Sequence, residues 1–317
     1  MPALLRPPSH RGPLVATGAV VLTAGVALQQ LRLGGEWDAG VHLLLTGALA
    51  ALFLWLAMAA PLEGGRPPAY QSVLLVCGLL ALLLALAWAA DALGADFGGY
   101  PAGALTAVFA AHAGAAFAFA VRRASGIAAL LGAISAAGAV LSAVDWIFDP
   151  SSATPFRWLL LLLAIAFVAV SLLLRASRQR PSEQLVNAAG LAILAIPVSA
   201  VAESFLAPRA PVLGGFWEVV TLAAGFGLIA YAGADRAPGP AYLGALNLAA
   251  FAVVTSLGVE PTLEWWPATL IVAGLALLAT GLRPARPLPP EPPAYRAGDV
   301  PLSARAEDDE TVVRVRE

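Results

Sequence analysis

Residues 72–90 read SVLLVCGLLALLLALAWAA, a stretch of 19 residues that contains no charged side chain. At about 1.5 Å per residue, a helix of this length nearly spans the ~30 Å hydrocarbon core of a bilayer. Hydrocarbon offers no hydrogen-bond partners, so the chain can cross it only in a structure, such as a helix, that satisfies its own backbone groups. The stretch therefore predicts a transmembrane helix.

Nine further apolar runs of similar length predict nine more such helices. They lie at residues 14–31, 41–60, 104–121, 126–144, 158–174, 185–206, 216–234, 241–259 and 266–282. Composition agrees, because 60% of the 317 residues are hydrophobic and 12% are charged, against about 25% charged in soluble domains. These values exclude a water-soluble fold. We predict an all-α integral membrane protein, a bundle of about ten transmembrane helices whose main partner is the lipid bilayer.

The bundle divides the chain into three segments. Residues 1–13 form an N-terminal segment, residues 14–282 the bundle, and residues 283–317 a tail that is rich first in proline and then in charge. Such a composition favours extended polyproline structure and disorder. We predict a disordered cytoplasmic tail that is available to a protein partner.

Arginine placement predicts the orientation. All 18 basic residues are arginine, which together with abundant Ala, Gly and Pro is typical of a GC-rich bacterial genome. With both termini in the cytoplasm, 15 arginines lie inside and only Arg32, Arg157 and Arg209 lie outside. Cytoplasmic loops of membrane proteins carry the excess of positive charge. We therefore expect a multi-pass protein of the bacterial plasma (inner) membrane with both ends inside.

Acidic and tryptophan residues mark the predicted outer edge. Seven of the eight tryptophans fall there. The candidate residues of this edge are Glu36, Trp37, Asp145, Trp146 and Glu218. One interpretation is an aromatic belt at the headgroup level. The other is an acidic vestibule that concentrates cations or cationic substrates above a pathway.

Short anchors suggest an internal repeat. Gly-Gly-Glu-Trp-Asp at residues 34–38 resembles Gly-Gly-Phe-Trp-Glu at residues 214–218, and the Arg-Pro-Pro-Ala-Tyr of residues 66–70 resembles residues 236–242. Helices 1–4 and 7–10 would then be parallel copies, related by an axis along the membrane normal as in some transporters. The alternative is chance similarity between Ala/Leu-rich helices.

Two ionisable residues within the runs are candidate pathway or ligand residues. His112 lies about 12 Å below the outer end of its helix, and an intramembrane ionisable group is a functional hypothesis by default. Alternatively, its neutral imidazole bonds a carbonyl of a packed helix. Glu203 follows Pro197 and would form a gated outer site with Glu218, or would simply pair with Arg32 or Arg209 at the headgroups.

Motifs of enzymatic chemistry are missing from the sequence. It contains no Walker loop, no His/Glu metal motif and no serine elbow. Its single cysteine, Cys77, lies inside an apolar run. We therefore predict a protein that is not an enzyme, with no cofactor, no metal site and no nucleic acid partner.

Two function classes follow. The first is a transporter or permease for a small or amphiphilic solute, and in size, helix number and short loops the chain is similar to the drug/metabolite transporters. That resemblance implies two inverted five-helix halves, whereas the anchors favour direct four-helix copies. The second class is a non-catalytic membrane scaffold or partner subunit with a cytoplasmic interaction tail.

Overall fold

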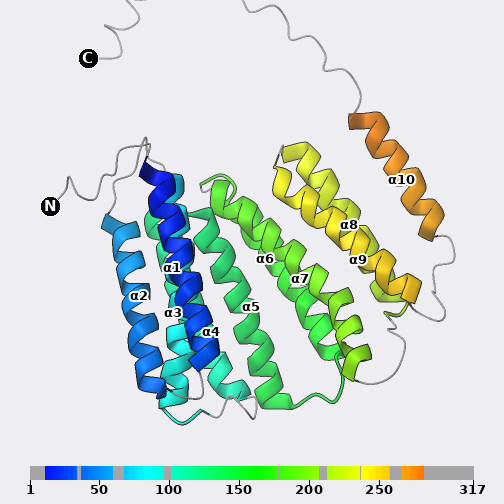
Figure 1. Ribbon diagram of the computed structural model, residues 1–317. Helices are drawn as coiled ribbons and strands as arrows, with labels where there is room; N and C mark the ends of the chain where they lie inside the picture. The colour runs from blue at the N-terminus through cyan, green and yellow to red at the C-terminus, as the bar shows by residue number, and fades with distance from the viewer. Residues whose placement is uncertain are drawn as a thin grey trace, which may run out of the picture. The chain divides into compact units, whose positions relative to one another are not determined.

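A computed structural model describes residues 11–33, 37–59, 68–95, 101–177, 179–206, 213–235, 237–257 and 266–281. These residues form ten helices (Figure 1): α1 (Gly12–Leu33), α2 (Ala39–Ala59), α3 (Ala69–Ala92), α4 (Ala102–Arg123), α5 (Gly126–Phe148), α6 (Thr154–Leu174), α7 (Gln179–Leu206), α8 (Gly215–Asp235), α9 (Pro238–Leu257) and α10 (Trp266–Gly281). The all-α class and the ten predicted helices are confirmed. The predicted tail, residues 283–317, lies outside the described residues.

Several helices extend beyond the apolar runs that predicted them. The clearest case is α7, which begins at Gln179 rather than at residue 185. Its first turns are polar, and Ser182 there exchanges hydrogen bonds of 2.9 Å with Ser171 near the end of α6. Hydropathy marks the part of a helix that hydrocarbon surrounds, whereas the helix itself continues into the interface.

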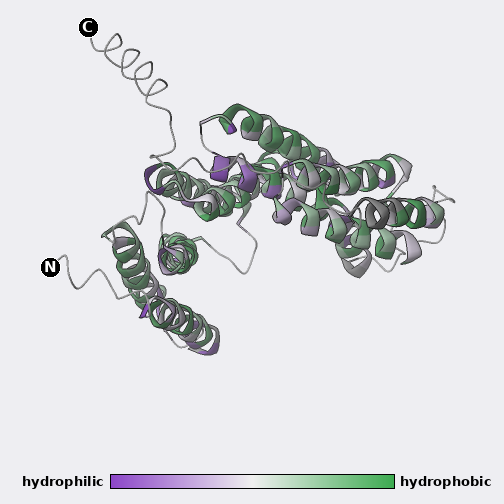
Figure 2. Ribbon diagram, turned by 90° about the horizontal axis from the view of Figure 1, so that it is seen from above, coloured by the Kyte–Doolittle hydropathy of each residue, from purple (hydrophilic) through white to green (hydrophobic). Residues whose placement is uncertain are grey.

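Nine of the ten helices, α1–α9, are long and apolar enough to cross a membrane, and α10 is described over 16 residues. Figure 2 shows hydrophobic residues along the helices and hydrophilic ones mainly near their ends. Many large apolar side chains point outward, including Leu44 on α2 and Leu173 on α6. The chain is a multi-pass membrane protein, and lipid covers these outward faces.

Helices α1–α9 belong to one compact unit, and α10 belongs to a second. Within the first unit, the closest packing joins α2 with α3, α4 with α5, α6 with α7 and α8 with α9. The odd-numbered helices also pack in order, α1 on α3, α3 on α5, α5 on α7 and α7 on α9. The unit is thus a series of helical hairpins, joined through their odd-numbered members.

The packing pattern repeats at shorter intervals along the chain than the predicted copies of helices 1–4 and 7–10. The contacts among α1, α2 and α3 recur among α7, α8 and α9, as the proposed copies require. The same contacts also recur among α3, α4 and α5 and among α5, α6 and α7. The period of the packing in the first unit is therefore two helices.

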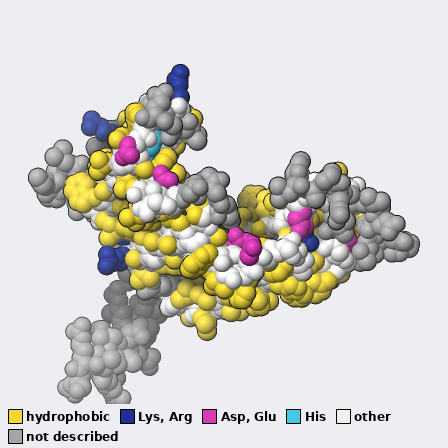
Figure 3. Space-filling model, turned by 90° about the horizontal axis from the view of Figure 1, so that it is seen from below, with side chains coloured by type: hydrophobic (Ala, Val, Ile, Leu, Met, Phe, Trp, Pro, Cys, Tyr) yellow, Lys and Arg dark blue, Asp and Glu magenta, His cyan; other side chains and the backbone are white. Residues whose placement is uncertain are grey.

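Contacts between helix ends show that successive helices alternate in direction. At the end predicted to be outer, Gln30 of α1 contacts His42 near the start of α2 and Trp88 near the end of α3. At the opposite end, a Cβ atom built on Gly12, the first residue of α1, would lie 3.3 Å from the ring of Tyr70 in the first turn of α3. Figure 3 views the predicted outer end and shows carboxylate side chains spread across it.

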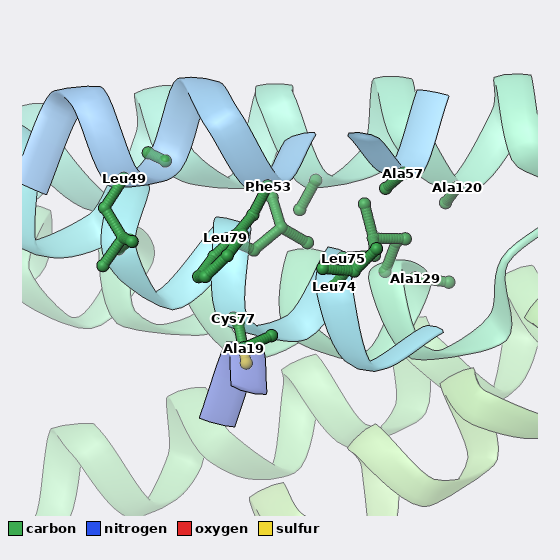
Figure 4. Packing of buried hydrophobic residues seen from close by; sticks show 14 residues of the cluster. Ala19, Leu49, Phe53, Ala57, Leu74, Leu75, Cys77, Leu79, Ala120 and Ala129 are labelled. Carbon is green, nitrogen blue, oxygen red and sulfur yellow. The ribbon is translucent and has the colours of Figure 1, made fainter. Parts of the chain in front are cut away.

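Two clusters of buried side chains form the core of the unit. The first joins α1–α5 and includes Phe53, Leu75 and Leu79 together with small residues such as Ala57 and Ala129 (Figure 4). The second joins α5–α9 around α7. Small side chains let the helix backbones approach closely, which is how helices associate where lipid is as apolar as the core.

Helices α8 and α9 approach each other closely at two glycines. A Cβ atom on Gly244 would lie 2.6 Å from the carbonyl oxygen of Gly225, and one on Gly225 would lie 2.7 Å from Leu248. A methyl group at Gly244 would therefore require the backbones to move apart, whereas one at Gly225 would require the Leu248 side chain to shift. In contrast, Gly227 on α8 has nothing within 4 Å of its Cβ position.

We expect Gly244→Ala to destabilise the protein by about 1–3 kcal/mol, the usual range for overpacking. Gly227→Ala is the matched control, and its effect should be neutral or stabilising by about 0.5–1 kcal/mol, because alanine favours the helix. Unfolding in detergent, followed by circular dichroism, measures both variants. Equal effects at the two positions would contradict the close approach of α8 and α9.

Candidate functional site

A buried arginine connects the start of α6 to the end of α7. Arg157, only 6% exposed, donates from Nε to Oγ of Ser199 at 3.0 Å and forms an ion pair with Glu203. Glu203 also accepts the backbone N–H of Ala153 at 3.1 Å. Both contacts lie beyond Pro197, so they fix the last turns of α7 to α6.

The partner of Glu203 differs from the expected one. The sequence suggested Arg32 or Arg209, but the structure pairs it with Arg157, while Arg32 is exposed and Arg209 lies outside the described residues. All three arginines are expected at the same depth, so depth alone could not choose among them. The choice depends on the packing of α6 against α7.

Aromatic side chains surround the same end of α6 and α8. The ring of Trp158 lies 5.0 Å from that of Phe216 and 4.9 Å from that of Trp217, measured between centroids. Glu218, the next residue, is 4% exposed in the first turn of α8. Its carboxylate therefore lies near the positive end of the helix dipole, which favours negative charge.

His112 is enclosed between three helices. Its Nδ1 lies 2.7 Å from Oγ of Ser135 on α5, and its Nε2 lies 2.9 Å from the carbonyl oxygen of Leu79 on α3. Because a carbonyl only accepts, Nε2 donates to it, and in the neutral form of the ring Nδ1 accepts from the serine hydroxyl. The imidazole is 1% exposed and uses both nitrogen atoms to hold α3, α4 and α5 together.

His42 has a different environment, which the sequence did not reveal. Its ring is fully buried and stacks on Trp88, with centroids 4.2 Å apart and planes at 13°, while Trp37 packs against it at 5.6 Å and 42°. Gln30 closes the group: its amide donates to the carbonyl of His42 at 3.4 Å and accepts from the indole of Trp88 at 3.2 Å. We call these four residues the His42 cluster.

Among the residues that the structure describes, neither ring nitrogen of His42 has a hydrogen-bond partner. A buried polar atom that makes no hydrogen bond costs about 1–3 kcal/mol. A small ligand that both donates and accepts hydrogen bonds would satisfy the donor and the acceptor of the ring. The His42 cluster is therefore the candidate binding site at this end of the molecule.

The remaining predicted edge residues do not converge on one site. Trp37 belongs to the His42 cluster, whereas Trp146 at the end of α5 lies against Gly103 of α4, where a Cβ atom would be 3.0 Å from the indole. Asp145 is half-buried beside Trp146, and Glu36 lies outside the described residues. Among the described part of the chain, no group of three or more His, Cys, Asp or Glu residues is placed to hold a metal ion.

Comparison with family models, curated proteins and solved structures finds no match for this chain.

Removing the buried arginine should cost more than removing an exposed one. Arg157→Gln would leave Glu203 without its cation. Arg175→Gln is the control, because the side chain of Arg175 is 52% exposed in its ion pair with Asp235. Exposed pairs contribute about 0–1 kcal/mol, and Arg157→Gln would in addition remove the hydrogen bond from the buried guanidinium to Ser199. Unfolding in detergent should rank Arg157→Gln as clearly less stable, and the reverse order would refute the role given to Arg157.

Proposed function

We propose that the protein is a non-catalytic scaffold or partner subunit of a bacterial inner membrane, with both termini in the cytoplasm. The observation that carries the proposal is the environment of His112, the most deeply placed ionisable residue of the sequence. Both of its nitrogen atoms bind neighbouring helices. A histidine on a solute or proton pathway needs a nitrogen atom that faces the pathway.

Other intramembrane polar side chains support the same proposal, because they also bind neighbouring helices. Ser171 and Ser182 join α6 to α7, and the amide of Asn247 on α9 donates to the carbonyl of Gly190 on α7 at 3.1 Å. Arg157 and Glu203 likewise join α6 to α7. Polar groups used in this way stabilise helix association in membranes.

The scaffold proposal predicts that the tail matters more than the carboxylates of Glu203 and Glu218. We expect deletion of residues 286–317 to abolish cross-linking to partner proteins in intact cells and to give the phenotype of the null strain. Glu203→Gln combined with Glu218→Gln should leave both unchanged. The opposite pattern would reject a scaffold, and tags that label from opposite faces of the membrane would reject the orientation.

Transport of a small solute is the second candidate, and the His42 cluster favours it. The cluster lies at the predicted outer end, where a solute arriving from outside would first meet the protein. The unpartnered donor and acceptor of the ring would bind such a solute, and Trp37 with Trp88 would enclose it beside an apolar surface.

His42→Phe separates this candidate from a purely structural role. Phenylalanine keeps an aromatic ring against Trp88 but removes both ring nitrogen atoms, so without solute the variant should be as stable as the natural protein or more stable by about 1–3 kcal/mol. In proteoliposomes, transport should fall at least tenfold. Unchanged transport with His42→Phe would exclude the His42 cluster from any solute pathway, and absence of transport by the natural protein would leave the scaffold.

A further inference from the structure

Three odd-numbered helices carry a glycine at the same place, six residues after the first residue of the helix. They are Gly18 of α1, Gly132 of α5 and Gly244 of α9. On α5 and α9 the preceding even-numbered helix packs on this glycine. A Cβ atom on Gly132 would lie 2.9 Å from Phe117 of α4, and one on Gly244 would lie 2.6 Å from the carbonyl oxygen of Gly225 of α8. The glycine thus marks the place where the two helices of a hairpin meet.

On α1 the same place is open. Nothing lies within 4 Å of a Cβ atom on Gly18, or of one on Gly25 two turns further along. Both glycines share one face of the helix with Leu14 and Val21, which are exposed as well. We call these four residues the open face of α1. In the part of the first unit that the structure describes, no helix reaches its glycines.

The open face of α1 corresponds to the face of α5 that α4 covers. The first residues of the two helices have equivalent contacts, because Gly12 meets α3 and Gly126 meets α7, in each case the next odd-numbered helix. Counted from these residues, Val21 corresponds to Ser135, whose hydroxyl bonds His112 of α4. A helix docked on α1 as α4 is docked on α5 would therefore cover the open face.

We propose that the open face of α1 binds α10 of a second copy of this chain. Each of α3, α5, α7 and α9 packs against the even-numbered helix that precedes it, and among these described odd-numbered helices only α1 is without one. Helix α10 is even-numbered, and residues 283–317 contain no apolar run that could form a hairpin with it. Two copies can thus complete one hairpin between them, and the contact is head to tail.

Direction and side chains agree with this assignment. Copies in one membrane share one orientation, and successive helices alternate, so α10 runs antiparallel to α1 as α4 does to α5. Ile271 and Leu275, one turn apart on α10, are exposed and can cover a glycine as Leu54 of α2 covers Gly78 of α3. Close approach at small residues is what joins helices in lipid. Gln29, exposed one turn before α1 ends, adds a carboxamide that a facing helix can hydrogen-bond and acyl chains cannot.

Disulfide cross-linking of the full-length chain in bacterial membranes tests the contact, with Cys77→Ala as the background. Val21→Cys and Leu275→Cys place exposed thiols near the middle of α1 and α10. Two differently tagged chains, each with one of these cysteines, should form a heterodimer on oxidation. Ile165→Cys, exposed in the middle of α6, replaces Val21→Cys in the control. Docking raises the effective concentration of the two thiols, so the control should give at least about tenfold less heterodimer.

Gly18→Leu tests the glycine itself. Because nothing lies within 4 Å of its Cβ position, leucine fits the folded chain but occupies the place of the second copy. The variant should reduce the heterodimer to the level of the Ile165→Cys control and lower the mass of the detergent-solubilised protein to that of one chain. Gly114→Leu makes the same change at another open glycine, on α4, and should do neither. Circular dichroism checks that both variants fold.

Other outcomes overturn the proposal. Homodimers of the Val21→Cys chain in place of the heterodimer would indicate that α1 pairs with α1. A disulfide that forms only within a chain carrying both cysteines would give the open face to that chain's own α10, and cross-linking to a different protein would give it to that protein. Unchanged heterodimer in Gly18→Leu, or an equal loss in Gly114→Leu, would exclude the open face. Both functions proposed above are compatible with either result.

Discussion

The absence of hydrogen-bond partners in hydrocarbon is the constraint on which this structure depends. It requires every backbone group within the membrane to be satisfied locally, so the chain repeats one element, the helix. It applies equally to polar side chains, which must find partners on neighbouring helices. His112, Arg157 and Asn247 each bind another helix, so the same constraint that selects helices also fixes which helices are neighbours.

Packing between the helices follows from the small side chains that the sequence supplies. Where lipid is as apolar as the core, burial of apolar surface does not drive helices together, and close van der Waals contact must do so. Gly225 with Gly244, and buried alanines of the first core cluster such as Ala57 and Ala129, permit such contact. Each hairpin then presents its odd-numbered helix to the next hairpin, which is why one contact pattern recurs along the first unit.

The sequence predicts the helices well because the hydropathy of each apolar run by itself indicates that hydrocarbon surrounds that segment. Their alternating direction also follows, since it requires only an uninterrupted series of crossings. Partners of polar residues do not follow in the same way. His42 and Trp88 are 46 positions apart, and Glu203 meets Arg157 across a similar separation, so these pairs depend on the relative rotation of two helices. Ala/Leu-rich helices have nearly uniform hydrophobicity around their axes, and the sequence therefore contains little information about that rotation.

Buried polar side chains have different kinds of partner at the two ends of the hairpin series. At one end Arg123 binds the last carbonyls of α2, which have no partner within their own helix, and two helix starts lie beside it. The positive charge of Arg123 thus lies at the negative end of the α2 dipole. At the other end His42 stacks between indole rings that offer its nitrogen atoms no hydrogen bonds. Stacking contributes about 0.5–1.5 kcal/mol per aromatic pair, whereas two unsatisfied nitrogen atoms cost about 1–3 kcal/mol each. Stacking therefore offsets only part of the cost of burying the two nitrogen atoms.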